Sequence, residues 1–242
     1  DGKKMSKSKG NVINPDEIIA EHGADTLRVY EMFMGPLEAD KPWDTRAVAG
    51  VSRFLKRWYK AVKHDLAEVQ PGESIETHGV TQTVRKLHQT IQKISTDLPE
   101  LKFNTAIAAM MEFLNTWEAR PTGEKGFTAF ELSRIIRMIA PFAPFLAEEL
   151  WHQFHQQIGE HPAHSREFVH LQSWPEFDHE LVKADTCTIV VQVNGKIRGQ
   201  FEVSTTEAQD AEGIKTQAQA LPEVQKWLVD TTGAKATPKK VI

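Results

Sequence analysis

The chain has 242 residues and a formal net charge of -4, from 29 lysines and arginines against 33 aspartates and glutamates. This length predicts two or three units that bury a core, and the single cysteine, Cys187, excludes a disulfide within the chain and favours a reducing, cytosolic setting. No apolar run approaches the roughly eighteen residues of a membrane span, and the acidic balance leaves nucleic-acid contact to local clusters of lysine and arginine.

The chain opens with DGKKMSKSKGN, a segment in which lysines alternate with serines. Lys4, Lys7 and Lys9 carry charges on long flexible side chains, and Ser6 and Ser8 add hydroxyl groups. Such a loop suits a polyphosphate, because one lysine–phosphate pair at about 4 Å has a Coulomb energy of about 4 kcal/mol in a partly shielded site before desolvation. A solvated basic terminus has the same composition, so both interpretations stand at this point.

Helix signals follow the loop. Asn14 is a natural N-cap ahead of a proline, and Gly23 should end this first helix. Asp25 is expected to cap a second helix, which should stop at Gly35 and the proline after it. The sequence therefore predicts a small helical unit over residues 1–43.

Four apolar stripes at steps of three and four residues come next, a spacing typical of amphipathic helices in an antiparallel bundle. They run through residues 48–62, 84–98, 107–117 and 132–139. Asn104 is expected to cap the third of these helices, and Thr128 with Glu131 has the spacing of a capping box for the fourth. Pro141 and Pro144 then predict a break, followed by a fifth helix of about three turns.

The bundle is expected to cover residues 44–183. Residues 158–186, which run to just past its end, have no sustained period and should cross the bundle surface. Four apolar side chains are expected to anchor this crossing: Phe168, Leu171, Trp174 and Phe177.

Beyond residue 185 the apolar period changes to two, which predicts two strands around Asn194 and Gly195. A two-residue turn would pair Val191 with Arg198 and mix apolar and charged side chains on one face. We therefore expect a three-residue loop with a left-handed Gly195 that pairs Val191 with Ile197.

A helix beginning at Ser204 with Glu207, a second helix in LPEVQKWLV and a last strand in PKKVI should complete the unit. The sequence predicts a small β-β-α-α-β domain over residues 184–242, whose last strand is cut off where the chain ends.

Two surfaces are candidates for RNA contact. The polar side of the first bundle helix carries Arg53, Lys56, Arg57, Lys60 and Lys63. In the expected register, the polar face of the hairpin carries Gln192, Lys196, Arg198 and Gln200, which suits recognition of structured RNA by shape. An ordinary solvated face is the alternative for the first surface.

At this point the residues carry a resemblance, because Lys4-Met5-Ser6-Lys7-Ser8 is the signature loop of class I aminoacyl-tRNA synthetases. Further stretches resemble the bacterial leucyl-tRNA synthetase family in the same order and cover nearly the whole chain. They are GNVINPDEIIAEHGADTLRVYEMFMGPLEADKPW, RFLKRW, LKFNTAIAAMMEFLN, APFAPFLAEELW and VQVNGKIRG. The resemblance implies a mainly α fold: a short helical segment with the KMSKS loop, a helical bundle of the anticodon-binding type, and a small α/β domain that binds tRNA.

The resemblance also implies an activity: the enzyme joins leucine to ATP, with Mg²⁺, as an adenylate and passes the acyl group to tRNA(Leu). Lys7 would be the main partner of the departing pyrophosphate and Lys4 would assist. Ser6 and Ser8 would shape the loop at ATP, and Met5 would pack beneath the loop or against adenine. Because charge develops on the phosphates as the bond breaks, a lysine that closes on them then lowers the barrier.

The sequence departs from the family in lacking the His-x-Gly-His signature and the inserted editing domain. We therefore expect the chain, which has no initiating methionine, to be the C-terminal part of a longer enzyme, inactive alone and without tightly bound ATP. That enzyme is expected to be cytoplasmic, monomeric and free of membrane contact. A valine- or isoleucine-type synthetase and a catalytically silent helical RNA-binding or interaction module are the alternatives. No metal site is expected, because the pairs His152/His155 and His161/His164 lack cysteine and fixed geometry.

Overall fold

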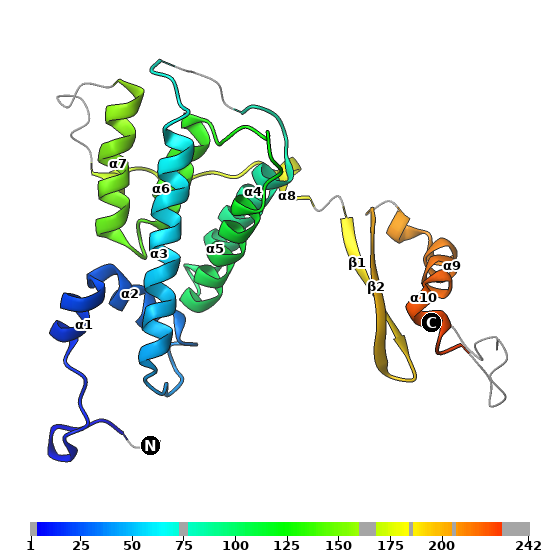
Figure 1. The fold of residues 1–242 in the computed structure, drawn as a ribbon, viewed down its shortest axis with the longest axis horizontal. Coiled ribbons are helices and arrows are strands. Elements are labelled where there is room, and N and C mark those ends of the chain that lie inside the picture. Colours follow the sequence, from blue (N-terminus) through cyan, green and yellow to red (C-terminus); the bar gives the residue numbers. More distant parts are fainter. Residues whose placement is uncertain (1–3, 73–76, 160–167, 184–185, 205–206, 229–242) are drawn as a thin grey trace. The chain divides into compact units, whose positions relative to one another are not determined.

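A computed structural model describes residues 4–72, 77–159, 168–183, 186–204 and 207–228 (Figure 1). The chain divides into two compact units, Asp1–Val182 and Lys183–Ile242. Among the described residues, no helix combines the length and the apolar character needed to cross a membrane.

The first unit is helical. Its helices are α1 (Pro15–His22), α2 (Ala24–Phe33), α3 (Thr45–Leu66), α4 (Gln82–Asp97), α5 (Phe103–Glu118), α6 (Ala129–Ile139), α7 (Pro144–Ile158) and α8 (His179–Val182). Short 3₁₀ turns form at Lys7–Lys9 and Val169–Leu171. Helix α4 packs against α5, α6 packs against α7, and α3 contacts α5, α6 and α7. The predicted mainly α fold with a helical bundle is confirmed.

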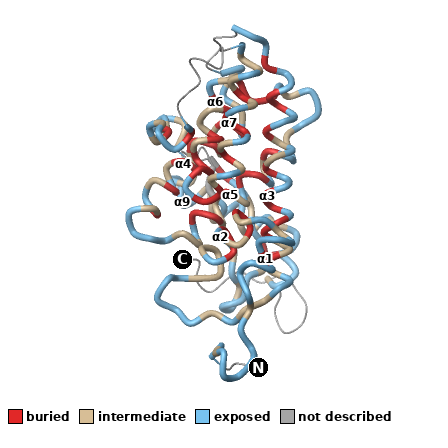
Figure 2. Tube along the Cα trace, turned by 90° about the vertical axis from the view of Figure 1, so that its left-hand side faces the viewer, coloured by how far each residue is buried: buried red, intermediate tan, exposed pale blue. Residues whose placement is uncertain are grey.

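The predicted apolar stripes form the core of this bundle. Figure 2 shows the buried residues along the inward sides of the helices. An aromatic cluster fills one end, where Trp58 of α3 lies 5.9 Å from Phe113 of α5 and Trp117 lies 5.0 Å from Phe127, measured between ring centroids. All four side chains are buried. Aromatic contacts between them therefore join α3, α5 and the segment before α6.

Of the four caps predicted in the first unit, those at Asn14 and Thr128 are confirmed and those at Asn104 and Asp25 are wrong. The side chain of Asn14 caps α1, Asp44 caps α3, and Thr128 forms the expected capping box with Glu131. Asn104 is not the cap of α5, which begins one residue earlier at Phe103. The physical reason is a tight turn after α4, in which the Lys102 backbone N–H donates to the Asp97 carbonyl at 3.0 Å and so fixes the entry of α5 earlier.

The sequence predicted that Asp25 caps α2, and this prediction is wrong. Asp25 caps a different helix, α7. Helix α2 begins at Ala24, and the Asp25 carboxylate accepts hydrogen bonds from the backbone N–H groups of Leu146 at 2.7 Å and Phe145 at 3.4 Å. These donors belong to the first turn of α7, whose own N-cap position, Ala143, has no polar side chain. This bond fastens the small helical unit to the bundle.

The segment after α7 is anchored differently from the prediction. Phe168 and Leu171 are exposed, so they are not anchors, and the buried residue between them is Val169. Its backbone N–H donates to the Glu148 carboxylate at 3.0 Å, which orients the turn so that Val169 faces inward. Trp174 packs against the core as predicted, as does Phe177.

The second unit begins with a hairpin of β1 (Thr186–Val193) and β2 (Lys196–Ser204), followed by α9 (Ala211–Ala220) and α10 (Pro222–Gln225). The predicted three-residue loop is wrong, because Val193 pairs with Lys196 across a two-residue turn. Asn194 and Gly195 have φ values of 53° and 74°, the left-handed pair that an Asn-Gly turn favours.

The predicted pairing of Val191 with Ile197 is also wrong. Ile197 lies opposite Gln192, and Val191 lies opposite Gly199, which leaves Arg198 as the additional residue of a bulge. A short turn alone would place apolar and charged side chains on one face. The extra residue of the bulge shifts the alternation of side chains along β2 by one, so that the apolar side chains farther along both strands lie on the same face.

Helices α9 and α10 cover that apolar face of the hairpin. A Cβ atom added to Gly199 would lie 3.2 Å from side-chain atoms of both Leu221 and Val224, so the strand and the helices approach closely there. The predicted start of the first helix at Ser204 with Glu207 is wrong, because α9 begins only at Ala211 and is capped by the side chain before it. The predicted last strand, PKKVI, lies outside the described residues.

Replacement of Asp25 tests the bond between the two helical parts of the first unit. We expect Asp25→Ala to lower the free energy of unfolding by about 1–2 kcal/mol, because the first N–H groups of α7 would lose their acceptor. Urea unfolding followed by circular dichroism measures this change. Asp40→Ala, at an exposed loop position, is the matched control and should change stability by less than about 0.5 kcal/mol. Equal losses in both variants would contradict the assignment.

Candidate nucleotide and RNA interface

The opening loop folds back on itself around one asparagine. The Ser6 backbone N–H donates to Asn11 Oδ1 at 2.9 Å, and Asn11 Nδ2 donates to the Lys4 carbonyl at 3.5 Å. The hydroxyl oxygens of Ser6 and Ser8 lie 3.2 Å apart. The sequence motif did not point to Asn11, although an asparagine directly after a glycine is a common turn signal.

The loop leaves its lysines open to solvent. Lys4, Lys7 and Lys9 are exposed, and no ion pair joins any of them to another described residue. Met5 is 40% exposed, so it does not pack in the core of the first unit. The arrangement presents several free cations on a short segment, and these residues fit a polyphosphate.

The basic side of α3 divides into bound and free cations. The Arg57 guanidinium donates to Glu118 and to Asn115 Oδ1, the latter at 2.8 Å, so Arg57 links α3 to α5. Its hydrogen bond with Glu118 raises the pKa of Arg57. The remaining cations are exposed and have no ion pair within the described part of the chain: Arg53, Lys56, Lys60 and Lys63.

Two of these free lysines border an apolar groove. Lys56 and Lys60 line a groove of about 640 Å³ between α2, α3 and α7, together with Tyr59 and Phe145. Phe145 is 70% exposed, which is unusual for phenylalanine. Cations beside an accessible aromatic ring suit the phosphates and bases of a single RNA strand.

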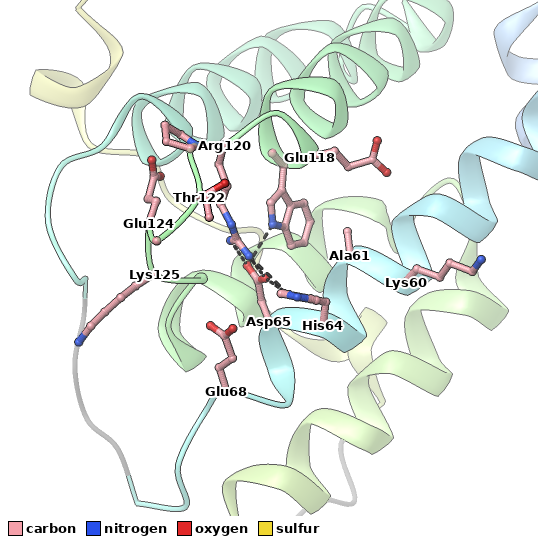
Figure 3. A pocket seen from close by; sticks show the side chains of 13 residues that line it. Lys60, Ala61, His64, Asp65, Glu68, Glu118, Arg120, Thr122, Glu124 and Lys125 are labelled. Atoms are coloured by element: carbon pink, nitrogen blue, oxygen red, sulfur yellow. Dashed lines mark hydrogen bonds and ion pairs between the residues drawn. The ribbon is translucent and has the colours of Figure 1, made fainter.

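A second pocket, of about 710 Å³, lies where α3 and α5 end, and a buried carboxylate forms its inner wall (Figure 3). Asp65 Oδ1 accepts from Arg120 at 2.5 Å, and Oδ2 accepts from Arg120 at 2.7 Å, from the Trp117 indole at 3.0 Å and from the Phe127 N–H at 2.9 Å. His64 Nδ1 lies 3.1 Å from Oδ1.

These contacts decide what Asp65 can do. Burial raises the pKa of its carboxyl, but the hydrogen bonds from Arg120, Phe127 and His64 outweigh burial and leave the pKa below its usual value. The carboxylate is ionised at neutral pH and its oxygens are occupied by donors. Asp65 is therefore a structural ion and not an acid or base for chemistry.

The hairpin separates its two predicted RNA-binding cations. Lys196 is exposed beside the turn. The prediction that Arg198 shares the polar face with Lys196 is wrong. The bulge turns the Arg198 guanidinium over the ring of Trp227, 3.4 Å from the ring centroid. This cation–π contact belongs to the packing of the second unit.

Histidines give no metal centre in the described part of the chain, where no cluster of three potential ligands occurs. His152 Nε2 lies 2.8 Å from the side-chain amide of Gln156, and His155 packs edge-on against Trp151. His161 and His164 lie outside the described residues.

Comparisons with known proteins identify the family of the chain. Residues 81–212 match the anticodon-binding domain of tRNA ligase, and residues 1–44 match the class I tRNA synthetases of the I, L, M and V type. The chain belongs to the class I tRNA ligases that carry this anticodon-binding domain. The resemblance found from the signature loop is confirmed.

Within that class, several similar proteins are leucine enzymes. The chain is 41% identical, over 100% of its length, to the leucine–tRNA ligase of Chlorobium phaeovibrioides, and 40% identical, over 90%, to that of Chloroherpeton thalassium. It spans 28% and 26% of the length of these two relatives. A crystal structure of the Agrobacterium radiobacter K84 agnB2 LeuRS–tRNA–LeuAMS ternary complex is similar with a TM-score of 0.65 and 29% identity, over 94% of this chain and 29% of that one.

Removal of the Asp65 carboxylate should be strongly destabilising. We expect Asp65→Ala to lower the free energy of unfolding by about 3 kcal/mol, because the largely buried Arg120, 14% exposed, would lose its partner. His64→Ala is the matched control from the same pocket, and since His64 is 66% exposed its loss should be below about 1 kcal/mol. Urea unfolding of both variants measures the difference, and similar losses would contradict the central role of Asp65.

The same carboxylate should make stability depend on pH. The pKa of Asp65 is lower in the folded than in the unfolded chain, so its contribution is complete above the unfolded pKa of about 4 and is lost as pH falls through the folded pKa. Urea unfolding between pH 6 and pH 3 should therefore show a shallower decline for Asp65→Asn than for the unaltered chain. Parallel declines would rule out this linkage.

Proposed function

We propose that the chain works as part of a leucine–tRNA ligase, which activates leucine with ATP and transfers it to tRNA(Leu). The observation that carries this proposal is the opening loop, where Lys4 and Lys7 stand exposed and without ion pairs in the described part of the chain. The leucine relatives support leucine over valine or isoleucine.

In this reaction a leucine carboxylate oxygen attacks the α-phosphorus of ATP. The bond from that phosphorus to the bridging oxygen breaks, and pyrophosphate leaves with the bonding electrons. Lys7, assisted by Lys4, stabilises the charge that develops on the leaving group, which lowers the barrier more than it tightens ATP binding. Ser6 and Ser8 shape the loop, and Met5 contacts the loop base or adenine. Mg²⁺ neutralises part of the phosphate charge when it is bound.

We also propose that the remaining parts bind tRNA. The domain division that goes with this role is residues 1–43 for the end of the catalytic region, 44–183 for the helical bundle and 184–242 for the small terminal domain. The free cations of α3 support contact with the RNA backbone, and Lys196 is the hairpin residue best placed to assist. Arg57 and Arg198 have internal partners, which makes them weaker candidates.

Three further features of the ligase stay predictions. The chain alone is expected not to form the adenylate, the enzyme is expected to be a cytoplasmic monomer, and tightly bound ATP is not expected on this chain.

The catalytic part of the proposal is tested at Lys7. In the full-length ligase that contains this chain, Lys7→Ala should slow leucine-dependent pyrophosphate exchange by about 100-fold in kcat, because the leaving group loses its main charge partner. Lys125→Ala, on the loop after α5 and far from this segment in sequence, is the control. Exchange as fast as in the unaltered enzyme would remove Lys7 from the mechanism.

The RNA part is tested on α3. We expect the double variant Lys56→Ala/Lys60→Ala to bind tRNA(Leu) more weakly and to flatten the slope of log affinity against log salt by about one unit per lysine. Filter binding of the full-length ligase at several salt concentrations measures the slope. Lys86→Ala removes a lysine that is paired with Glu112 at 3.1 Å and should leave the slope unchanged. An unchanged slope in the double variant would exclude this surface.

A further inference from the structure

The opening loop has a defined shape although little packing supports it. Residues 4–12 are exposed or half-buried, and none of them belongs to the buried core of the first unit. Figure 1 shows this segment extending beyond α1. A loop of this kind normally samples many backbone conformations, so local hydrogen bonds must restrict it.

Asn11 supplies two of these restraints from a single side chain. Its Oδ1 accepts the Ser6 N–H at 2.9 Å, and its Nδ2 lies 3.5 Å from the Lys4 carbonyl, so the amide spans the backbone on both sides of Met5. Of the two contacts, the shorter bond to Ser6 is the firmer one. The side chain thus closes the loop across the stretch that joins Lys4 to Lys7.

The backbone between Ser6 and Asn11 has a conformation that brings these two residues together. Lys7–Lys9 form one 3₁₀ turn, which ends when the Gly10 N–H donates to the Lys7 carbonyl at 3.1 Å. Gly10 has a φ of 64°, and an added Cβ would meet no atom within 4 Å. Glycine is therefore needed for its left-handed backbone and not for space, and that backbone reverses the chain so that Asn11 reaches Ser6.

We propose that Asn11 is a positioning residue for adenylate formation: it holds the loop in the shape that delivers Lys4 and Lys7 together to the departing pyrophosphate. This inference rests on the proposed function. Asn11 itself needs no contact with ATP, because its effect passes through the backbone of Lys4 and Ser6. Pre-ordering the loop reduces the conformational freedom that must be lost when the lysines close on the phosphates.

The two half-reactions provide a test that a general loss of structure would not reproduce. Pyrophosphate departs in the first step only. In the full-length ligase, Asn11→Ala should therefore lower kcat for adenylate formation by about 10-fold, the effect of one net hydrogen bond, with little change in the KM for leucine. Transfer of leucine from preformed adenylate to tRNA should keep its rate. Asn14→Ala, which removes the same side chain three residues on, is the matched control for α1 and should not separate the two steps.

A double-mutant cycle with Lys7 completes the experiment. If Asn11 acts through the lysines, Asn11→Ala should slow adenylate formation much less in a Lys7→Ala background than in the unaltered enzyme. Additive effects, equal slowing of both half-reactions, or an equal effect of Asn14→Ala would each overturn the inference. Normal adenylate formation in Asn11→Ala with slow formation in Lys7→Ala would overturn the role of Asn11 and leave the proposed function intact. Normal rates in both variants would overturn both.

Discussion

The buried carboxylate of Asp65 is the contact on which one end of the bundle depends. It belongs to α3, yet its partners are the Trp117 indole and the Arg120 guanidinium near the end of α5 and the Phe127 N–H before α6. Removing a charge from water is unfavourable unless such donors replace the solvent, so the carboxylate, the guanidinium and the aromatic rings around them are stable only together. That requirement fixes where α3 ends relative to α5 and α6.

The position of α3 in turn orients both candidate surfaces of the first unit. Its inward side is held by Trp58 in the aromatic cluster and by Asp65, so the opposite side, with Lys56 and Lys60, must face solvent. At the other end, Asp25 ties α2 to the first turn of α7, and α2 also contacts α3. The helical segment that follows the opening loop is thereby joined to α7 and to α3, the helix with the basic side.

Local patterns in the sequence predicted the helices of the first unit and the caps at Asn14 and Thr128, because apolar spacing and a capping box involve residues within one turn of each other. Partners distant in the sequence were not predictable in this way. Asp25 has the spacing of a cap for α2, and only the folded chain reveals that α7 lacks a cap and takes it. The bulge at Arg198 was not predictable for a similar reason: the apolar alternation distinguishes a two-residue from a three-residue turn, whereas the chain combines a two-residue turn with an inserted residue. The signature motif identified the lysines of the opening loop as candidate site residues. The role of Asn11 follows from its hydrogen bonds in the folded loop.

The pairing of cations inside the fold decides which of them can meet a ligand, and three arginines show this most clearly. Arg57 and Arg120 each use the fork of a guanidinium to bind a carboxylate of the same chain, and Arg198 stacks its plane on Trp227. A guanidinium suits these roles because it is planar, weakly hydrated and able to donate two parallel hydrogen bonds. The ammonium groups of the opening loop and of α3 are compact, strongly hydrated charges that gain little from one exposed carboxylate, and they stay in solvent. In an acidic chain, the charge available to phosphates is therefore set less by the number of cations than by which of them the fold has already paired.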